Sequence, residues 1–219
     1  MRTSTSRTRS CWRRRARARS PSGARAREPR WSQRFCVDSR RSSVRPGGRV
    51  RVLGIDPGSV ATGYGVVSVE GSTLRRIAGG TIRARGETLA ARLAQLQSEL
   101  AGAIAELAPE CAAIESIFSA RNVRSALVLG HARGVALATC GSAGLGAAEY
   151  TPAQVKTAVT GYGRADKSQV MRMVQRLLGL TAPPPSDEAD ALAIAICHGM
   201  SARLRARVVA PARGLVRAP

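Results

Sequence analysis

An apolar run that ends on an acid and a tight turn constrains the fold of this chain most. Residues 52–55 are apolar, Asp56 follows them, and Pro57 and Gly58 begin a turn before a second run starts at Thr62. Proline fixes φ and glycine tolerates positive φ, so the chain can reverse just after Asp56. The pattern predicts a β-hairpin with this carboxylate at its open end. Taken alone, it also fits an aspartate that only caps a turn.

The residues around this motif predict further strands and a long helix. β-rich runs at 51–56, 63–70 and 74–83 indicate a three-stranded antiparallel meander. Within 86–108, leucine and isoleucine recur at spacings of three and four, which predicts a helix with one buried face. Pro109 ends it.

Strands and helices alternate in the second half of the domain. Strands are predicted at 111–117 and 145–150, with a helix at 121–140 between them. That helix is apolar on more than one face, so it is either a central core helix or is covered by another subunit. Three further helices are predicted at 152–160, 168–178 and 187–204, capped at their starts by Thr151 for the first and Ser186 for the last. The order predicts an α/β domain with one five-stranded mixed sheet flanked by helices.

Positive charge is concentrated before this domain. The chain has a formal net charge of +21, and residues 1–49 carry 16 Arg against only Glu28 and Asp38. This segment has no sustained helical or strand period, and we expect it to be disordered. Residues 50–204 form the predicted domain, and residues 205–219 a loose basic tail. Such a charge favours a polyanionic partner.

Several interpretations of residues 1–49 stay open. The segment could be a nucleic-acid-binding arm, an Arg-rich transit peptide, or sequence translated from an upstream start. A twin-arginine signal at 13–15 is excluded because no apolar stretch follows it. If the third interpretation holds, a chain that begins at Val50 should keep full activity.

Cysteine usage and hydropathy narrow the class of protein. The five cysteines are scattered, without CxxC or Cys/His clustering, so neither a zinc site nor a disulfide framework is indicated. A reducing cytoplasm fits this pattern. The longest apolar run near the C-terminus covers 191–197, far short of the ~20 residues that a membrane-spanning helix requires, and no membrane segment is predicted.

Three acids besides Asp56 stand where acids are costly. Glu115 interrupts a buried strand, and Asp187 and Asp190 lie three residues apart, on one face of the last helix. A lone buried carboxylate is strongly unfavourable, so these groups need partners or cations. Hard oxygen ligands without nearby His or Cys favour Mg²⁺ or Mn²⁺. Two such ions can activate a water and stabilise the leaving oxygen in the hydrolysis of a phosphodiester.

Each acid also has a plainer interpretation. Asp187 could simply favour the helix N-terminus through the helix dipole, and Glu188 is expected to do no more than that.

Six stretches of the chain resemble the RuvC family of Holliday junction resolvases, within the RNase H-like nuclease superfamily. They occur in the family's order at residues 51–58, 114–118, 129–135, 154–156, 167–170 and 187–193. The resemblance implies an RNase H-like fold, and catalytic and metal-binding roles for Asp56, Glu115, Asp187 and Asp190. The family's Met-Arg-Val-Leu start aligns with Val50.

The resemblance also implies how the protein acts. It implies a homodimeric endonuclease of DNA recombination and repair that nicks two strands of a four-way junction symmetrically. Each subunit would hold two Mg²⁺, with Mn²⁺ as an alternative, and the partners would be the branch-migration proteins RuvA and RuvB. Symmetric paired cuts themselves require two active sites related by a two-fold axis.

Four further residues are predicted DNA contacts. Phe118 matches an aromatic that inserts at the junction centre, although it could instead close a core strand. Lys156 and Lys167, the only lysines in the chain, match family lysines near the scissile backbone. Arg164 lies in the loop before Lys167. The chain departs from the family at Glu188, where a small residue is usual and the acid adds negative charge beside the site.

Two other functions compete with a nuclease. The spacing of Asp56 and its following glycines also resembles the phosphate loop of actin-like and sugar-kinase ATPases, but that fold needs two such domains and does not require the acids at 187 and 190. A catalytically silent RNase H-like binding module is the second alternative. A Mg²⁺-dependent nicking assay on a four-way junction would distinguish them.

Overall fold

A single five-stranded sheet forms the centre of the domain. The computed structural model describes residues 48–58, 60–116 and 123–209. The strands are β1 (Arg49–Asp56), β2 (Thr62–Glu70), β3 (Thr73–Ile82), β4 (Cys111–Glu115) and β5 (Ala147–Tyr150). They lie in the order β3-β2-β1-β4-β5. The predicted antiparallel meander is confirmed, because β2 pairs antiparallel with both β1 and β3.

The other half of the sheet is parallel. β4 pairs parallel with β1 and with β5, which confirms the predicted mixed sheet. Ile55 pairs with Ile114, so Asp56 and Glu115, the next residue of each strand, lie at the same edge. The parallel register therefore brings two acids together that are far apart in the sequence.

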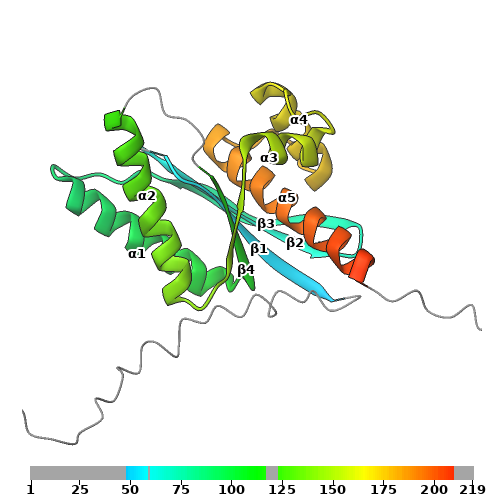
Figure 1. Cartoon of the computed structure of the whole chain (residues 1–219), viewed down its shortest axis with the longest axis horizontal. Helices are drawn as coiled ribbons and strands as arrows, with labels where there is room; N and C mark the ends of the chain where they lie inside the picture. Colours follow the sequence, from blue (N-terminus) through cyan, green and yellow to red (C-terminus); the bar gives the residue numbers. More distant parts are fainter. Residues whose placement is uncertain (1–47, 59, 117–122, 210–219) are drawn as a thin grey trace, which may run out of the picture. The chain divides into compact units, whose positions relative to one another are not determined.

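Helices cover both faces of the sheet (Figure 1). They are α1 (Leu89–Leu107), α2 (Val123–Ser142), α3 (Pro152–Thr160), α4 (Lys167–Leu178) and α5 (Ser186–Val209). One core lies between the sheet and α1 with α2, and the other between the sheet and α3, α4 and α5. The sheet is thus the middle layer of three.

Local sequence accounts for the helix ends. Thr88 caps α1 by accepting from the Ala91 N–H, and Leu96, Leu100 and Ile104 of the predicted stripe are buried. Thr151 caps α3 as predicted and forms a capping box with Gln154. A second capping box starts α4.

Two glycines let α5 lie directly on the sheet. A Cβ on Gly54 would come within 2.7 Å of the Ala195 backbone nitrogen, and one on Gly63 within 2.6 Å of the Asp187 carbonyl carbon. Any side chain at these positions would push the helix away. The close approach places the first turn of α5 over the end of β1, where Asp56 pairs with Gly63.

The structure corrects four boundary and packing predictions. Arg49 was assigned to the extension but is the first residue of β1, where its Nε donates to Ser68 Oγ at 3.0 Å. Ser186 is already helical, since the Ala189 N–H donates to the Pro185 carbonyl, and α5 continues past the predicted end at 204 to Val209. α2 is buried on one face only, so it is not a central core helix.

Two further observations concern the cysteines and the lengths of the helices, within the part of the chain that is described. Cys111, Cys140 and Cys197 are free thiols. Among the described helices, none is both long and apolar enough to cross a membrane. Residues 1–47, and the tail from residue 210, lie outside the described residues, so the predictions for them stay predictions.

Candidate active site

Asp56 and Glu115 point to the same face of the sheet. On β1, Leu53 and Ile55 belong to the core beneath α1 and α2, whereas Val52 belongs to the core beneath α5. Strand side chains alternate between faces, so Asp56 lies on the α5 side. The same alternation on β4 places Glu115 on the α5 side too. The sequence pattern predicted the two acids, and the sheet decides that they face one helix.

The first turn of α5 brings two more carboxylates to this edge. Asp187 lies over Gly63, and Asp190 follows one helical turn later. The Asp190 Oδ2 lies 3.0 Å from Lys167 Nζ, and the Asp187 Oδ2 lies 4.0 Å from an Arg83 guanidinium nitrogen. We refer to four carboxylates as the acidic edge: Asp56, Glu115, Asp187 and Asp190.

The proximity of these carboxylates raises the pKa of two of them, Asp56 and Glu115. The pKa of Asp56 rises from 3.8 to about 7, first because the group is buried and then because Glu115 and Asp190 repel its charged form. Burial, followed by Asp190, also raises the pKa of Glu115. Lys167 opposes both shifts. Burial with like charges is the pattern found at sites that bind cations or transfer protons.

The donor set fits a hard divalent cation. All four groups of the acidic edge are carboxylates, the ligands that Mg²⁺ and Mn²⁺ prefer. Within the described ranges, however, no three acidic, histidine or cysteine side chains are arranged as a ready-made metal cage. Lys167 contacts Asp190 instead. Coordination would therefore require the carboxylates to turn toward a shared ion, with Lys167 releasing Asp190.

The predicted DNA contacts have different surroundings. Lys156 lies on α3 close enough to Glu115 to lower the pKa of that acid. The Lys167 side chain is 78% exposed at the start of α4, and its contact with Asp190 raises its pKa. Arg164 is exposed on the α3–α4 loop. Phe118 lies outside the described residues.

Two arginines near the acidic edge were missed by the sequence analysis. Arg83 follows the end of β3, which lies at the same edge as Asp56 because Gly63 pairs with both Asp56 and Thr81. Arg133 on α2 donates to the Glu115 carbonyl at 3.3 Å and pairs with Glu149 of β5 at 2.6 Å. In the sequence, only position distinguishes these two arginines. Arg83 ends a predicted strand, and Arg133 lies within a stretch that resembles the RuvC family.

The prediction for Glu188 was wrong. This acid is buried, with 5% of its side chain exposed, and its Oε1 lies 2.6 Å from Arg76 Nε on β3. Glu188 and Arg76 therefore form an internal ion pair between α5 and the sheet. A helix-dipole role alone would have left Glu188 on the surface.

Comparison with known proteins identifies the family. Residues 52–198 match the family model described as "Crossover junction endodeoxyribonuclease RuvC". The chain belongs to the RuvC family. The RuvC proteins of Alkalilimnicola ehrlichii and Cupriavidus metallidurans are 49% and 51% identical, over 72% and 68% of this chain and 96% and 83% of theirs.

Solved RuvC structures agree with the fold. Thermus thermophilus RuvC has a TM-score of 0.66 at 37% identity, over 71% of this chain and 97% of that one. The same protein solved in complex with a Holliday junction substrate also has a TM-score of 0.66, at 34% identity over the same shares of the two chains. The yeast mitochondrial resolvase Ydc2, at 15% identity and a TM-score of 0.54, covers 78% of this chain and 86% of its own, and shares the fold. The predicted RNase H-like α/β fold, RuvC membership and endonuclease class are confirmed.

Proposed function

We propose that this chain resolves Holliday junctions by metal-dependent hydrolysis at the acidic edge. One observation carries the proposal: β1, β4 and α5 contribute carboxylates to one edge of the sheet, so close together that Glu115 and Asp190 raise the pKa of Asp56 and Asp190 raises the pKa of Glu115. Membership of the RuvC family supports the substrate, because Thermus thermophilus RuvC has been solved with a Holliday junction. The reaction is a pair of symmetric nicks in a four-way junction.

Magnesium is the proposed cofactor, with two ions per subunit and Mn²⁺ as a substitute. The all-oxygen donor set supports this choice over zinc. When bound, such a pair of ions supplies an activated water and stabilises the leaving oxygen of the phosphodiester. Asp56 is the ligand most affected, since a neighbouring cation favours its ionised form and opposes the burial that raises its pKa.

Four residues are proposed to hold the DNA. Lys156 and Lys167 lie beside the acids and can hold phosphates next to the scissile bond without reading bases. Arg164, exposed on the loop between α3 and α4, extends this positive surface. Phe118 would stack on a base at the junction centre.

We propose that α2 forms the interface of a homodimer. Leu127 is 59% exposed, and open space surrounds Gly130, Gly134 and Gly141 where a Cβ would stand. A helix face of exposed apolar and small residues allows a second helix to pack closely. A two-fold axis there would supply the two active sites that symmetric nicking requires.

The remaining proposals follow from the family alone. RuvA and RuvB are the proposed protein partners, and the cytoplasm, where bacterial DNA recombines, is the proposed location. Co-purification of the chain with RuvA and RuvB from cells of its source would test the first.

A nicking assay on a synthetic four-way junction tests the central proposal. The wild type should cut opposed strands in Mg²⁺ and not in EDTA. Asp56→Asn should bind the junction with unchanged affinity but should not cut it, since it removes one ligand charge. Glu70→Gln, which removes an exposed acid at the opposite end of the sheet, is the matched control and should cut normally.

Different failures distinguish the alternatives. If the wild type binds junctions in Mg²⁺ without cutting them, the chain is a silent binding module. If it binds ATP and not DNA, the actin-like interpretation is correct. Equal cutting by Asp56→Asn would refute the proposed site while leaving the proposed reaction in place.

A further inference from the structure

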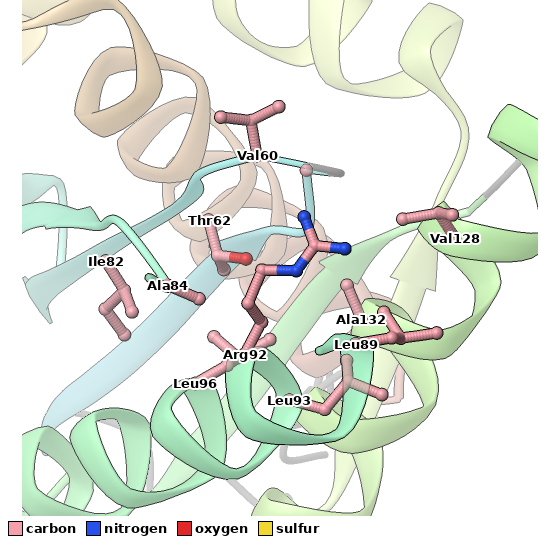
Figure 2. A pocket seen from close by; sticks show the side chains of 11 residues that line it. Val60, Thr62, Ile82, Ala84, Leu89, Arg92, Leu93, Leu96, Val128 and Ala132 are labelled. Carbon is pink, nitrogen blue, oxygen red and sulfur yellow. The ribbon is translucent and has the colours of Figure 1, made fainter. Parts of the chain in front are cut away.

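A small pocket lies beside the turn that follows Asp56, on the other side of the sheet from α5. It is a cavity of about 20 Å³ between the β1–β2 turn, the end of β3, α1 and α2. Its walls are almost entirely apolar: Val60, Ile82, Leu93, Leu96, Val128 and Ala132. Figure 2 shows one charged side chain among them, Arg92, which rises from α1 toward the turn beside Val60.

Arg92 has no counter-charge among the described residues that line this pocket. None of them is a carboxylate, and the Arg92 Nε is fully buried without a hydrogen-bond partner among the described residues. It is the one side-chain nitrogen or oxygen atom in that condition among the described residues. Buried donors are nearly always satisfied in native proteins, so an orphaned guanidinium nitrogen needs an explanation.

Arg92 is also not a counter-ion of the acidic edge. The charges that shift the pKa of Asp56 come from Glu115, Asp190, Lys167 and Asp187, and Arg92 is not among them. Arg92 rises from α1, which packs on the face of the sheet opposite α5, and its guanidinium lies beneath the turn beside Val60 (Figure 2). Because Arg92 is only half-buried and no acid of the described residues lines its pocket, its charge can reach an anion from outside the chain.

We propose that Arg92 binds a backbone phosphate of the DNA at the mouth of this pocket, with one phosphate oxygen entering the cavity to accept from the buried Nε. The guanidinium fork matches phosphate oxygens, and the apolar walls exclude the water that would otherwise weaken the contact. A cavity of about 20 Å³ has room for a single oxygen or water but none for a base, so the contact is independent of sequence. Gly58, two residues after Asp56, lines the same pocket, so the phosphate would lie next to the turn that presents the catalytic acid.

This inference rests on the proposed function, which supplies the DNA. A purely structural role is the competing explanation, in which the Arg92 stem packs between α1 and the turn and the charge is incidental. The phosphate contact and the structural role predict different effects of salt concentration and of phosphate modification on DNA binding. A structural arginine affects folding but adds no phosphate contact.

Junction binding is measured in the Asp56→Asn background, which separates binding from cutting. Arg92→Gln should weaken binding roughly 10-fold, as expected for one charge-assisted contact. It should reduce the slope of log K against log salt by about 0.9, the value for one phosphate. Arg92→Lys, which keeps the charge, should retain the slope. Arg75→Gln is the matched control, because it removes an exposed arginine from the end of β3 opposite Asp56 and should change neither quantity.

A neutral-phosphate scan locates the contact. Methylphosphonates are placed singly along the junction arms, each removing one charge. One position should weaken binding of the parent protein about 10-fold and have no further effect on Arg92→Gln. If every methylphosphonate affects both proteins equally, or if the salt slope is unchanged in Arg92→Gln, the proposal is wrong and Arg92 is structural.

Failure of the proposed function gives a different result. If the wild type does not cut junctions but Arg92→Gln still loses one phosphate from the salt slope, the nuclease proposal fails and the phosphate contact stands. If Arg92→Gln does not fold, Arg92→Lys provides the test. An unchanged slope of log K against log salt, together with sensitivity to the same single methylphosphonate, supports the contact. Loss of that sensitivity overturns it.

Discussion

Two groups of acids meet at the first turn of α5, and they differ in what balances their charge. Glu188 faces β3, is almost completely buried, and has its own arginine at 2.6 Å. Its neighbour Asp187 and the nearby Asp190 face the acidic edge, with 38% and 25% of their side chains exposed. Glu188 forms a closed ion pair within the fold, whereas among the described residues Asp187 and Asp190 contact only exposed cations, Arg83 and Lys167, and stay open to an ion from solvent.

Burial alone does not distinguish a structural acid from a functional one. Glu188 is buried and Asp56 half-buried, yet of the two only Asp56 shares its surroundings with other carboxylates and has its pKa raised to about 7. A dedicated partner makes an acid structural, whereas crowding with like charges makes it a candidate for metal binding.

The largest expected effect is on cleavage. Glu115→Gln should lower the rate of junction cutting at least ~10³-fold, because it removes a ligand charge at the reacting centre. Glu188→Gln should stay within about 10-fold of the wild type. Single-turnover cutting of a labelled junction at saturating protein measures both, with gel-shift binding as the control. A comparable loss in the two variants would show that the paired acid also serves catalysis.

The next effect is on stability, at the ion pair. Arg76→Met leaves Glu188 buried without its partner, and we expect it to lower the free energy of unfolding by about 3 kcal/mol. The Arg76 side chain is 33% exposed, which keeps the loss at the lower end of the usual range. Adding Glu188→Met should restore most of this loss. Urea denaturation of both variants measures it, and a double variant no more stable than Arg76→Met would contradict the assignment.

Asp56 should make stability depend on pH. Its pKa is 3.8 unfolded and about 7 folded, so between these values the folded state retains a proton that the unfolded state releases, and stability falls as pH rises. Without metal, Asp56→Asn should therefore be about 2 kcal/mol more stable than the wild type at pH 8. The gap should close below pH 4. Thermal melts across this range test it, and Mg²⁺ should narrow the gap at pH 8 by stabilising the wild type.

The smallest effect is expected at the exposed ion pair of the acidic edge. The Lys167 side chain is 78% exposed and holds Asp190 at 3.0 Å. Lys167→Met should change the free energy of unfolding by less than about 0.5 kcal/mol, because solvent screens such pairs. It should also raise the pKa of Asp56 further, since Lys167 lowers it. NMR titration of the Asp56 carboxyl measures that shift, and a large loss of stability would show that this pair resembles the one at Glu188.

Periodicity and turn chemistry predicted most of the fold. The meander, the stripe on α1 and the Thr151 cap are local features, decided by residues within one or two turns of each other. Errors arose where a distant part of the chain decides the outcome. The start of β1 at Arg49 depends on pairing with Glu70, which the composition of an arginine-rich segment does not reveal.

The site was predictable only as a set of residue types. The four acids were chosen because carboxylates in apolar runs are costly, and the resemblance to RuvC gave them roles. Arg83 and Arg133 were missed, since nothing local distinguishes them from other arginines in a chain with a net charge of +21. Arg92 was missed for the same reason.

The residues alone are enough to predict the family, the order of the elements and the acids that a metal site would need. Which acids face one another, and which are already paired, depends on how distant parts of the chain pack. Asp187 and Glu188 are adjacent and chemically alike, but successive residues of a helix point about 100° apart. One therefore reaches the edge that holds Asp56, and the other the arginine on β3. The turn after Asp56 places this acid at the edge of the sheet. Gly54 and Gly63 let α5 pack closely against β1 and β2, which brings Asp187 and Asp190 near Asp56.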